Sequence, residues 1–197
     1  PYGMKANAAG GAEKPALSQT DGLTYTEARH TLRYWLLFGI ATSVITAINI
    51  FYPSEAPHLS DSGYSVTTAA MITSVSMGGL ALGKVLLGRI FDRWGVFAGA
   101  MLACSATFLG LLGMIFCRIV PMLALVLFGM TFGSVFGAMC LPFITSALFG
   151  MKDYSVILGK LNVAVSIGCA IGPFLSGRIY DSAGSYVPAY WLGMVLT

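Results

Sequence analysis

The sequence predicts an all-α membrane protein, and this prediction rests on composition, on the spacing of charged residues and on an internal repeat. Mean hydropathy is +0.79, with 56% hydrophobic and only 10% charged residues, whereas soluble domains carry about 25% charged residues. Uncharged runs cover residues 34–54, 62–83, 94–117, 119–151 and 161–177. Each reaches the roughly 17 to 25 residues that a helix needs to cross the hydrocarbon core. These runs therefore predict five membrane-spanning helices.

Proline, glycine and charged residues between the runs set the expected helix limits. The first helix is expected over 34–52, where Pro53 would end it and an outer loop over 53–61 would follow. The second is expected over 64–87, closed by a polar turn over 89–95. Three more are expected over 96–117, 120–149 and from after Tyr154 to 179, with kinks at Pro142 and Gly172-Pro173.

A sixth helix begins near Val187 and reaches the last residue of the sequence, Thr197. Its eleven residues would cover only about 16 Å of the membrane at the helical rise. The sequence also begins at Pro1 rather than at Met. We therefore expect the chain to be a piece of a longer protein.

Residues 1–32 are expected to form a linker, and residues 33–197 a transmembrane helical bundle. The first part is rich in Ala, Gly, Pro, Lys and Glu without an apolar core, and it lacks the hydrophobic segment of a signal peptide. If it is cytoplasmic, most basic residues share its side, namely Lys5, Lys14, Arg29, Arg33, Arg89, Arg93, Lys152 and Lys160. Only Arg118 and Arg178 lie opposite. Because excess Lys and Arg marks the cytoplasmic face, we expect this orientation, in the plasma or inner membrane.

The residues from Gly79 to Gly95 recur in altered form from Gly168 to Gly184. The copies read GLALGKVLLGRIFDRWG and GCAIGPFLSGRIYDSAG, and nine of the seventeen aligned positions are identical. Three expected crossings separate the copies, which would put them on opposite faces of the membrane. Inverted helix triplets are typical of secondary transporters. A chance match between Gly-rich helices is the alternative, and the matching Arg and Asp positions argue against it.

Gly88, Asp92, Arg93 and Gly95 resemble the G-x-x-x-D-R-x-G loop that follows the second helix of each half of major facilitator superfamily proteins. The stretch 172–186 resembles the end of the eleventh helix of that family. The resemblance implies half of a twelve-helix bundle, namely the central loop, helices seven to eleven and the start of the twelfth. It also implies that the four loop residues gate the cytoplasmic side, that the N-terminal half is a partner, and that a small solute crosses by alternating access.

Two polar stripes mark helix faces that we expect to line a cavity for the solute. Positions i, i+4 and i+7 lie on one side of a helix. The first stripe comprises Thr42, Thr46 and Asn49. The second comprises Asn162, Ser166 and Cys169. Polar side chains in a bilayer need a partner or water, and the alternative is that each binds a neighbouring backbone group.

Lys84 is the most specific candidate for binding a substrate. It lies among glycines of the second expected helix, aligned with Thr73 and Met77, and a charge at the bilayer centre costs about 2.5 to 3.5 kcal/mol. The spacing from Gly83-Lys84 to Gly88 resembles the eighth helix of monocarboxylate and oxalate:formate transporters, where a basic residue serves the substrate carboxylate. This implies a small organic anion such as a monocarboxylate, with proton (H+) or ion coupling. The alternative is a Lys84 side chain that snorkels to the membrane surface.

The remaining residues indicate no enzyme, metal site or cofactor. His30, before the first helix, and His58, in the expected outer loop, are interpreted as solvated. No spacing of nucleophile and base, phosphate loop or metal ligands is present, and a net charge of +3 does not indicate nucleic-acid binding. Two other functions stay open, namely a drug, sugar or nutrient carrier of the same superfamily, and a non-transporting membrane receptor or assembly subunit.

Overall fold

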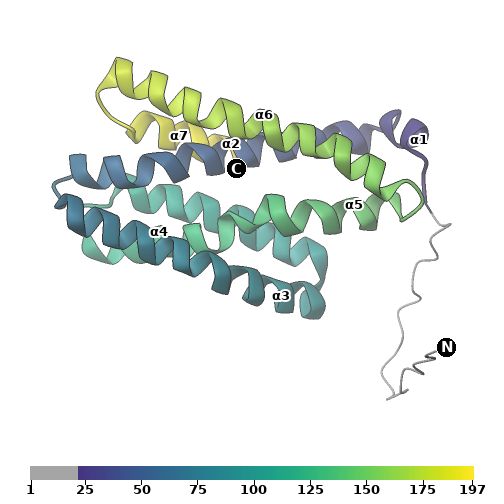
Figure 1. Cartoon of the computed structure of the whole chain (residues 1–197), viewed down its shortest axis with the longest axis horizontal. Coiled ribbons are helices and arrows are strands. Elements are labelled where there is room, and N and C mark those ends of the chain that lie inside the picture. Colours follow the sequence, from purple (N-terminus) through teal and green to yellow (C-terminus); the bar gives the residue numbers. More distant parts are fainter. Residues whose placement is uncertain (1–21) are drawn as a thin grey trace, which may run out of the picture.

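The computed structural model describes residues 22–197, and Figure 1 shows them as long helices that run side by side along one axis. The elements are α1 (Tyr25–Arg29), α2 (Leu32–Asp61), α3 (Val66–Ile115), η1 (Val120–Met122), α4 (Leu123–Gly133), η2 (Phe136–Cys140), α5 (Leu141–Phe149), α6 (Tyr154–Ala183) and α7 (Val187–Leu196). The stretches Leu32–Asp61, Val66–Ile115, Val120–Phe149 and Tyr154–Ala183 are long and apolar enough to cross a membrane. The predicted all-α membrane fold is confirmed.

Helix α3 contains two of the predicted spans, joined at a bend. Its 50 residues are helical except at Gly95, where φ is 84° and ψ is 171°. Only glycine adopts such a φ readily. The predicted turn over 89–95 is therefore wrong except at its last residue. Leu87 and Phe91 explain the difference, because both are buried one turn apart and continue the apolar face of the helix.

Helix α2 also continues beyond its predicted end. Pro53 and Pro57 lie inside it, so the expected outer loop over 53–61 is wrong. Each proline removes one helical hydrogen bond, and membrane helices tolerate this when neighbours stabilise the segment. Here Glu55, His58 and Leu59 are buried against other helices, and this packing outweighs the local preference for a break.

The stretch Val120–Phe149 is interrupted where the sequence predicts a kink. Residues Phe136–Cys140 form a π-helical turn, and Pro142 lies in the first turn of α5, which begins immediately afterwards. A π turn of this kind usually marks a local break in a helix. In α6, by contrast, the helix runs through Pro173 without interruption.

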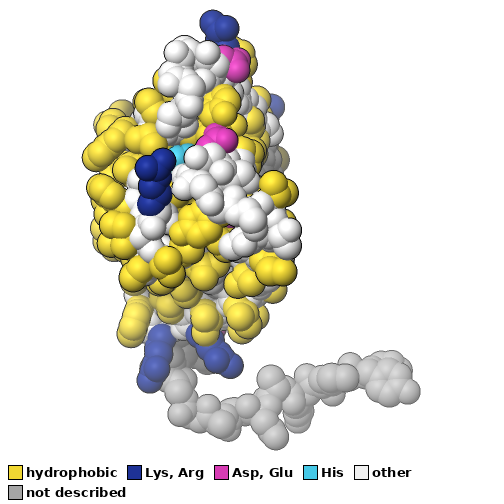
Figure 2. All heavy atoms as spheres, turned by 90° about the vertical axis from the view of Figure 1, so that its left-hand side faces the viewer, with side chains coloured by type: hydrophobic (Ala, Val, Ile, Leu, Met, Phe, Trp, Pro, Cys, Tyr) yellow, Lys and Arg dark blue, Asp and Glu magenta, His cyan; other side chains and the backbone are white. Residues whose placement is uncertain are grey.

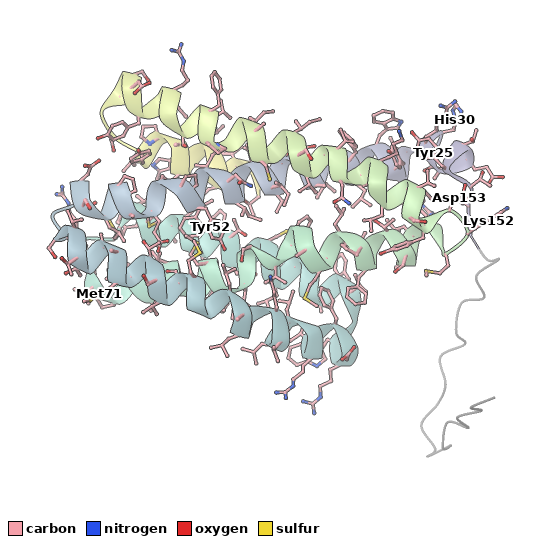
Figure 3. All side chains as sticks on the ribbon, in the orientation of Figure 1. Tyr25, His30, Tyr52, Met71, Lys152 and Asp153 are labelled. Atoms are coloured by element: carbon pink, nitrogen blue, oxygen red, sulfur yellow. The ribbon has the colours of Figure 1, made fainter. Side chains whose placement is uncertain are left out.

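Helix α1 lies inside the expected linker and ties its end to the bundle. Thr24 and Glu27 form a capping box at the start of α1, and Ala28 is buried. The Tyr25 backbone N–H donates a 2.9 Å hydrogen bond to the Asp153 carboxylate, and Figure 3 shows these two residues together at one end of the bundle. Residues 22–32 are thus packed against the bundle, which corrects the expectation of an unfolded linker for this part. Residues 1–21 lie outside the described residues, and the domain boundary at 32 stays a prediction.

The two copies of the repeat end at opposite ends of the bundle. The bend in α3, at Gly95, lies toward the end of the bundle where α2 begins, whereas α6 finishes, before Gly184, at the end where α2 finishes (Figure 1). Both glycines have positive φ, at 84° and 65°. This arrangement agrees with an inverted repeat, and the side of the membrane that each copy faces stays a prediction.

Small residues allow close helix contacts within the bundle. A Cβ atom added at Gly110 of α3 would lie 2.8 Å from the Cα atom of Gly129 of α4. A Cβ atom added at Gly172 of α6 would lie 2.5 Å from the Asn49 Cβ atom of α2. Such contacts are typical of membrane helices, where packing rather than water exclusion drives association. The Gly172 contact places α6 against the predicted polar stripe of α2, and the Gly110 contact places α3 against α4.

Candidate functional site

Lys84 lies on an exposed face of α3 that carries small and polar residues. Positions that alternate by four and three residues share one face of a helix. The exposed residues on this face with Lys84 are Ala70, Ser74, Met77 and Ala81. Large apolar side chains occupy a separate exposed face, at Val75, Leu82 and Leu86. Lys84 and Met77 therefore share a face that differs in character from the one suited to lipid.

Thr73 lies three turns before Lys84 on the same side of α3, as the sequence aligned the two, but α2 covers it there. Its hydroxyl oxygen is buried without a hydrogen-bond partner, and it lies beside the Glu55 carboxyl of α2. Thr73 thus belongs to a contact between α2 and α3 in the interior.

The two predicted polar stripes meet where α2 packs against α6. The Asn49 side-chain amide lies 3.5 Å from the Cys169 sulfur, which links the last member of each stripe. Asn49 also donates to the Ile45 carbonyl at 2.9 Å. One contact between the stripes is therefore present at this interface.

Most hydroxyls of these stripes bind their own helix backbone. Thr42 donates to the Phe38 carbonyl at 2.9 Å, and Thr46 to the Thr42 carbonyl at 2.7 Å. Thr46 is only 4% exposed, so in this structure its side chain is not accessible to a solute. These bonds lie within α2 itself, and the expected role of the stripe in binding a solute stays a prediction.

The α6 stripe has a different setting, because its side chains are exposed. Asn162, Ser166 and Cys169 lie on one exposed face, and the Ser166 hydroxyl donates to the Asn162 carbonyl at 3.0 Å. This bond uses the Asn162 backbone, and the exposed Asn162 side chain is accessible to a solute or to water. The apolar Val163 and Phe174 are exposed on another side of α6. As on α3, a polar exposed face is separate from an apolar one.

A buried carboxyl on α2 was missed by the sequence reasoning. Glu55 has no exposed surface, and its Oε1 atom accepts a 2.8 Å hydrogen bond from the Ser76 hydroxyl of α3. Its Oε2 atom and the Thr73 hydroxyl are both buried without a partner. The spacing of Phe51, Glu55 and Leu59, four residues apart, could have indicated one buried side of a continuing helix. Pro53 and Pro57 instead favoured a loop.

His58 belongs to the same buried region, and its predicted solvent exposure is wrong. Its ring is only 6% exposed, and Nε2 lies 3.0 Å from the Met114 carbonyl oxygen. The ring packs edge-on against Tyr190 of α7, with centroids 5.0 Å apart, and the Tyr190 hydroxyl donates to the Ser54 hydroxyl at 3.0 Å. His30, by contrast, is exposed as expected.

Residues 34–197 match the family model described as Major Facilitator Superfamily. The chain belongs to this superfamily. It is 31% identical over 162 residues to the MFS-type transporter SLC18B1 of Rattus norvegicus, covering 74% of this chain and 33% of the relative. It is 27% identical over 179 residues to Monocarboxylate transporter 11 of Homo sapiens, covering 82% of this chain and 36% of the relative. The chain spans about a third of the length of these curated relatives.

The residues expected to gate the cytoplasmic side, as the superfamily resemblance implies, lie in α3. Gly88, Asp92 and Arg93 lie in the last helical turns before the Gly95 bend, so they form a helix end rather than a loop. Asp92 and Arg93 are exposed, at the end of the bundle where α2 begins. Their gating role stays a prediction.

Proposed function

We propose that this superfamily member is the C-terminal half of a secondary transporter that moves a small organic anion, such as a monocarboxylate, by alternating access. Its partner would be the N-terminal half of the same protein, packed against the polar exposed faces of α3 and α6. Residues 1–32 would then lie in the cytoplasm, and the bundle would span the plasma or inner membrane. The observation that carries the proposal is the exposed Lys84 on a face of α3 shared with small residues and Met77.

The surroundings of Lys84 suit a carboxylate ligand. Ala81 and Met77 lie one and two turns before it on the same exposed face, and Ala81 has a small side chain. Asp92 lies eight residues further along the helix, roughly 12 Å along the helix axis. A charge within the membrane needs a partner, and this supports a bound anion as the partner of Lys84 in the proposed cavity between the two halves.

The name of one relative supports the same class of substrate. Monocarboxylate transporter 11 is similar over most of this chain, whereas the name of the rat relative specifies no substrate. The second candidate is a drug, sugar or nutrient carrier. In such a carrier the Lys84 side chain would extend its ammonium toward the membrane surface instead of binding the solute.

The experiment that separates these candidates is an uptake panel with the complete transporter in lipid vesicles. Radiolabelled L-lactate and pyruvate represent monocarboxylates, glucose represents sugars, and a lipophilic cation represents drugs. Saturable uptake of a monocarboxylate, with no uptake of the others, supports the proposal. Uptake of glucose or the cation alone would support the second candidate, and uptake of none would favour a receptor or assembly subunit.

A further inference from the structure

We propose that Glu55 is the proton-binding group that couples solute movement to a proton gradient. This inference rests on the proposed function, since it assigns a residue to the coupling step of that transporter. It is carried by the burial of the carboxyl, by its unequal hydrogen bonding and by the two prolines that flank it.

The two oxygens of Glu55 differ in a way that fits a neutral acid. Oε1 accepts a 2.8 Å hydrogen bond from Ser76, while Oε2 is sealed from solvent without a donor. The Thr73 hydroxyl lies beside the same carboxyl, and its oxygen is buried without a hydrogen-bond partner. A protonated carboxyl carries one O–H donor, and a small adjustment would let it donate to Thr73. An ionised carboxylate would instead leave a buried charge with hydroxyl donors but without a positively charged partner.

Among the residues that the structure describes, the side chains around Glu55 include no Lys or Arg. On α2, Tyr52 lies one turn before it, with His58 and Asp61 on the following turns. Helix α3 contributes the hydroxyls of Ser76 and Thr73, and α7 contributes the Tyr190 phenol. Within residues 22–197, no Lys or Arg charge acts on this carboxyl. Glu55 is thus placed to exchange a proton rather than to hold a salt bridge.

A route for protons begins at the nearby end of the bundle. A hollow of about 520 Å³ opens there, lined by His58, Asp61, Arg118 and the residues after α6. Figure 2 views the molecule from this end, where a few charged side chains interrupt a largely apolar surface. His58 lies one turn beyond Glu55 on the same helix, so it separates the carboxyl from the hollow by a single turn.

The prolines give α2 a means of opening this route. Pro53 and Pro57 lie two residues before and two residues after Glu55, and neither has a backbone N–H to stabilise the helix. Helices bend most readily at such positions. A bend here would expose Glu55 to the hollow in one conformation. In the other conformation this route would be closed and the carboxyl would be open to the opposite side of the membrane. In the first it takes a proton from water, and the same proton returns to water on the other side of the membrane after the conformational change.

Two measurements on the purified complete transporter test this assignment, using Glu55→Gln and the control Asp181→Asn, which alters an exposed acid on α6. Infrared difference spectra recorded across a pH change should contain a protonated-carboxyl band that Glu55→Gln removes and Asp181→Asn keeps. In lipid vesicles, Glu55→Gln should exchange radiolabelled L-lactate at equal pH yet lose accumulation driven by an inward proton gradient. Asp181→Asn should do both.

Each outcome bears on a separate claim. Accumulation by Glu55→Gln equal to that of the unmodified protein, or an unchanged carboxyl band, would overturn the assignment. Absence of lactate exchange by the unmodified protein would count against the proposed substrate class, while the infrared band would still decide whether Glu55 binds a proton. If Glu55→Gln fails to insert, Glu55→Asp should keep proton-driven accumulation and shift the band, and an unshifted band would contradict the assignment.

Discussion

The Ser76 hydroxyl donates a 2.8 Å hydrogen bond to the Glu55 carboxyl, and this bond joins α2 to α3 in a region closed to solvent. Two helices that the sequence separates by an expected loop are thereby connected through a polar pair. A buried acceptor that loses its donor keeps the full cost of desolvation. The pair therefore contributes to the stability of the bundle as well as to the proposed proton site.

Replacing Ser76 by alanine should destabilise the protein measurably. The change leaves both Glu55 oxygens without a donor, which costs about 1 to 3 kcal/mol. Thermal unfolding of the purified protein in detergent would detect this as a lower midpoint. Ser74→Ala is the matched control, because Ser74 is exposed two residues earlier and bonds only to its own helix at Ala70. Equal midpoints for the two variants would show that the Ser76 bond carries no stability.

The contact between Gly110 and Gly129 should not tolerate a side chain. A Cβ atom at Gly110 would lie 2.8 Å from the Gly129 backbone and equally close to the Phe51 ring, so Gly110→Ala would force α3 and α4 apart. Overpacking of this kind costs about 1 to 3 kcal/mol. Gly78→Ala is the control, since no atom lies within 4 Å of its added Cβ. A Gly110→Ala protein as stable as Gly78→Ala would contradict the close packing of these helices.

Single cysteines at Trp94 and Ser182, in a cysteine-free background, should react with a membrane-impermeant reagent from opposite sides. Both positions are exposed, and they lie at opposite ends of the bundle, just before Gly95 and Gly184. Three crossings between them require this result for an inverted repeat. Labelling of intact cells and of inverted vesicles would measure it. Reaction of both cysteines from one side would refute the inverted arrangement.

The fold was largely predictable because its signals are long and apolar. Hydrophobic runs located every span, and the positive-φ glycines that end both repeat copies coincide with the predicted ends of the repeat. The extension of α2 was not predictable from local preference, since Pro53 and Pro57 normally end a helix. Only the tertiary burial of the residues between and after them, which a single sequence does not display, reverses that preference.

The candidate site was predictable in part. Lys84 and Met77 share an exposed face, as their spacing indicates, and the two polar stripes touch at Asn49 and Cys169. Thr73 is enclosed while Lys84 is exposed, because helical spacing predicts the side of a helix on which a residue lies but not which neighbouring helix covers that side. Glu55 was missed for a related reason, since its importance comes from enclosure by α3 and α7 rather than from any motif.

The most direct test of the central claim is the response of anion transport to the charge at Lys84. Lys84→Gln, Lys84→Arg and the control Lys152→Gln, in the exposed turn before α6, would be compared in the complete transporter at matched expression. If the ammonium binds the substrate carboxylate, Lys84→Gln should abolish uptake of radiolabelled L-lactate, Lys84→Arg should retain part of it, and Lys152→Gln should retain all of it. Normal lactate uptake by a well-inserted Lys84→Gln protein would contradict the organic-anion assignment.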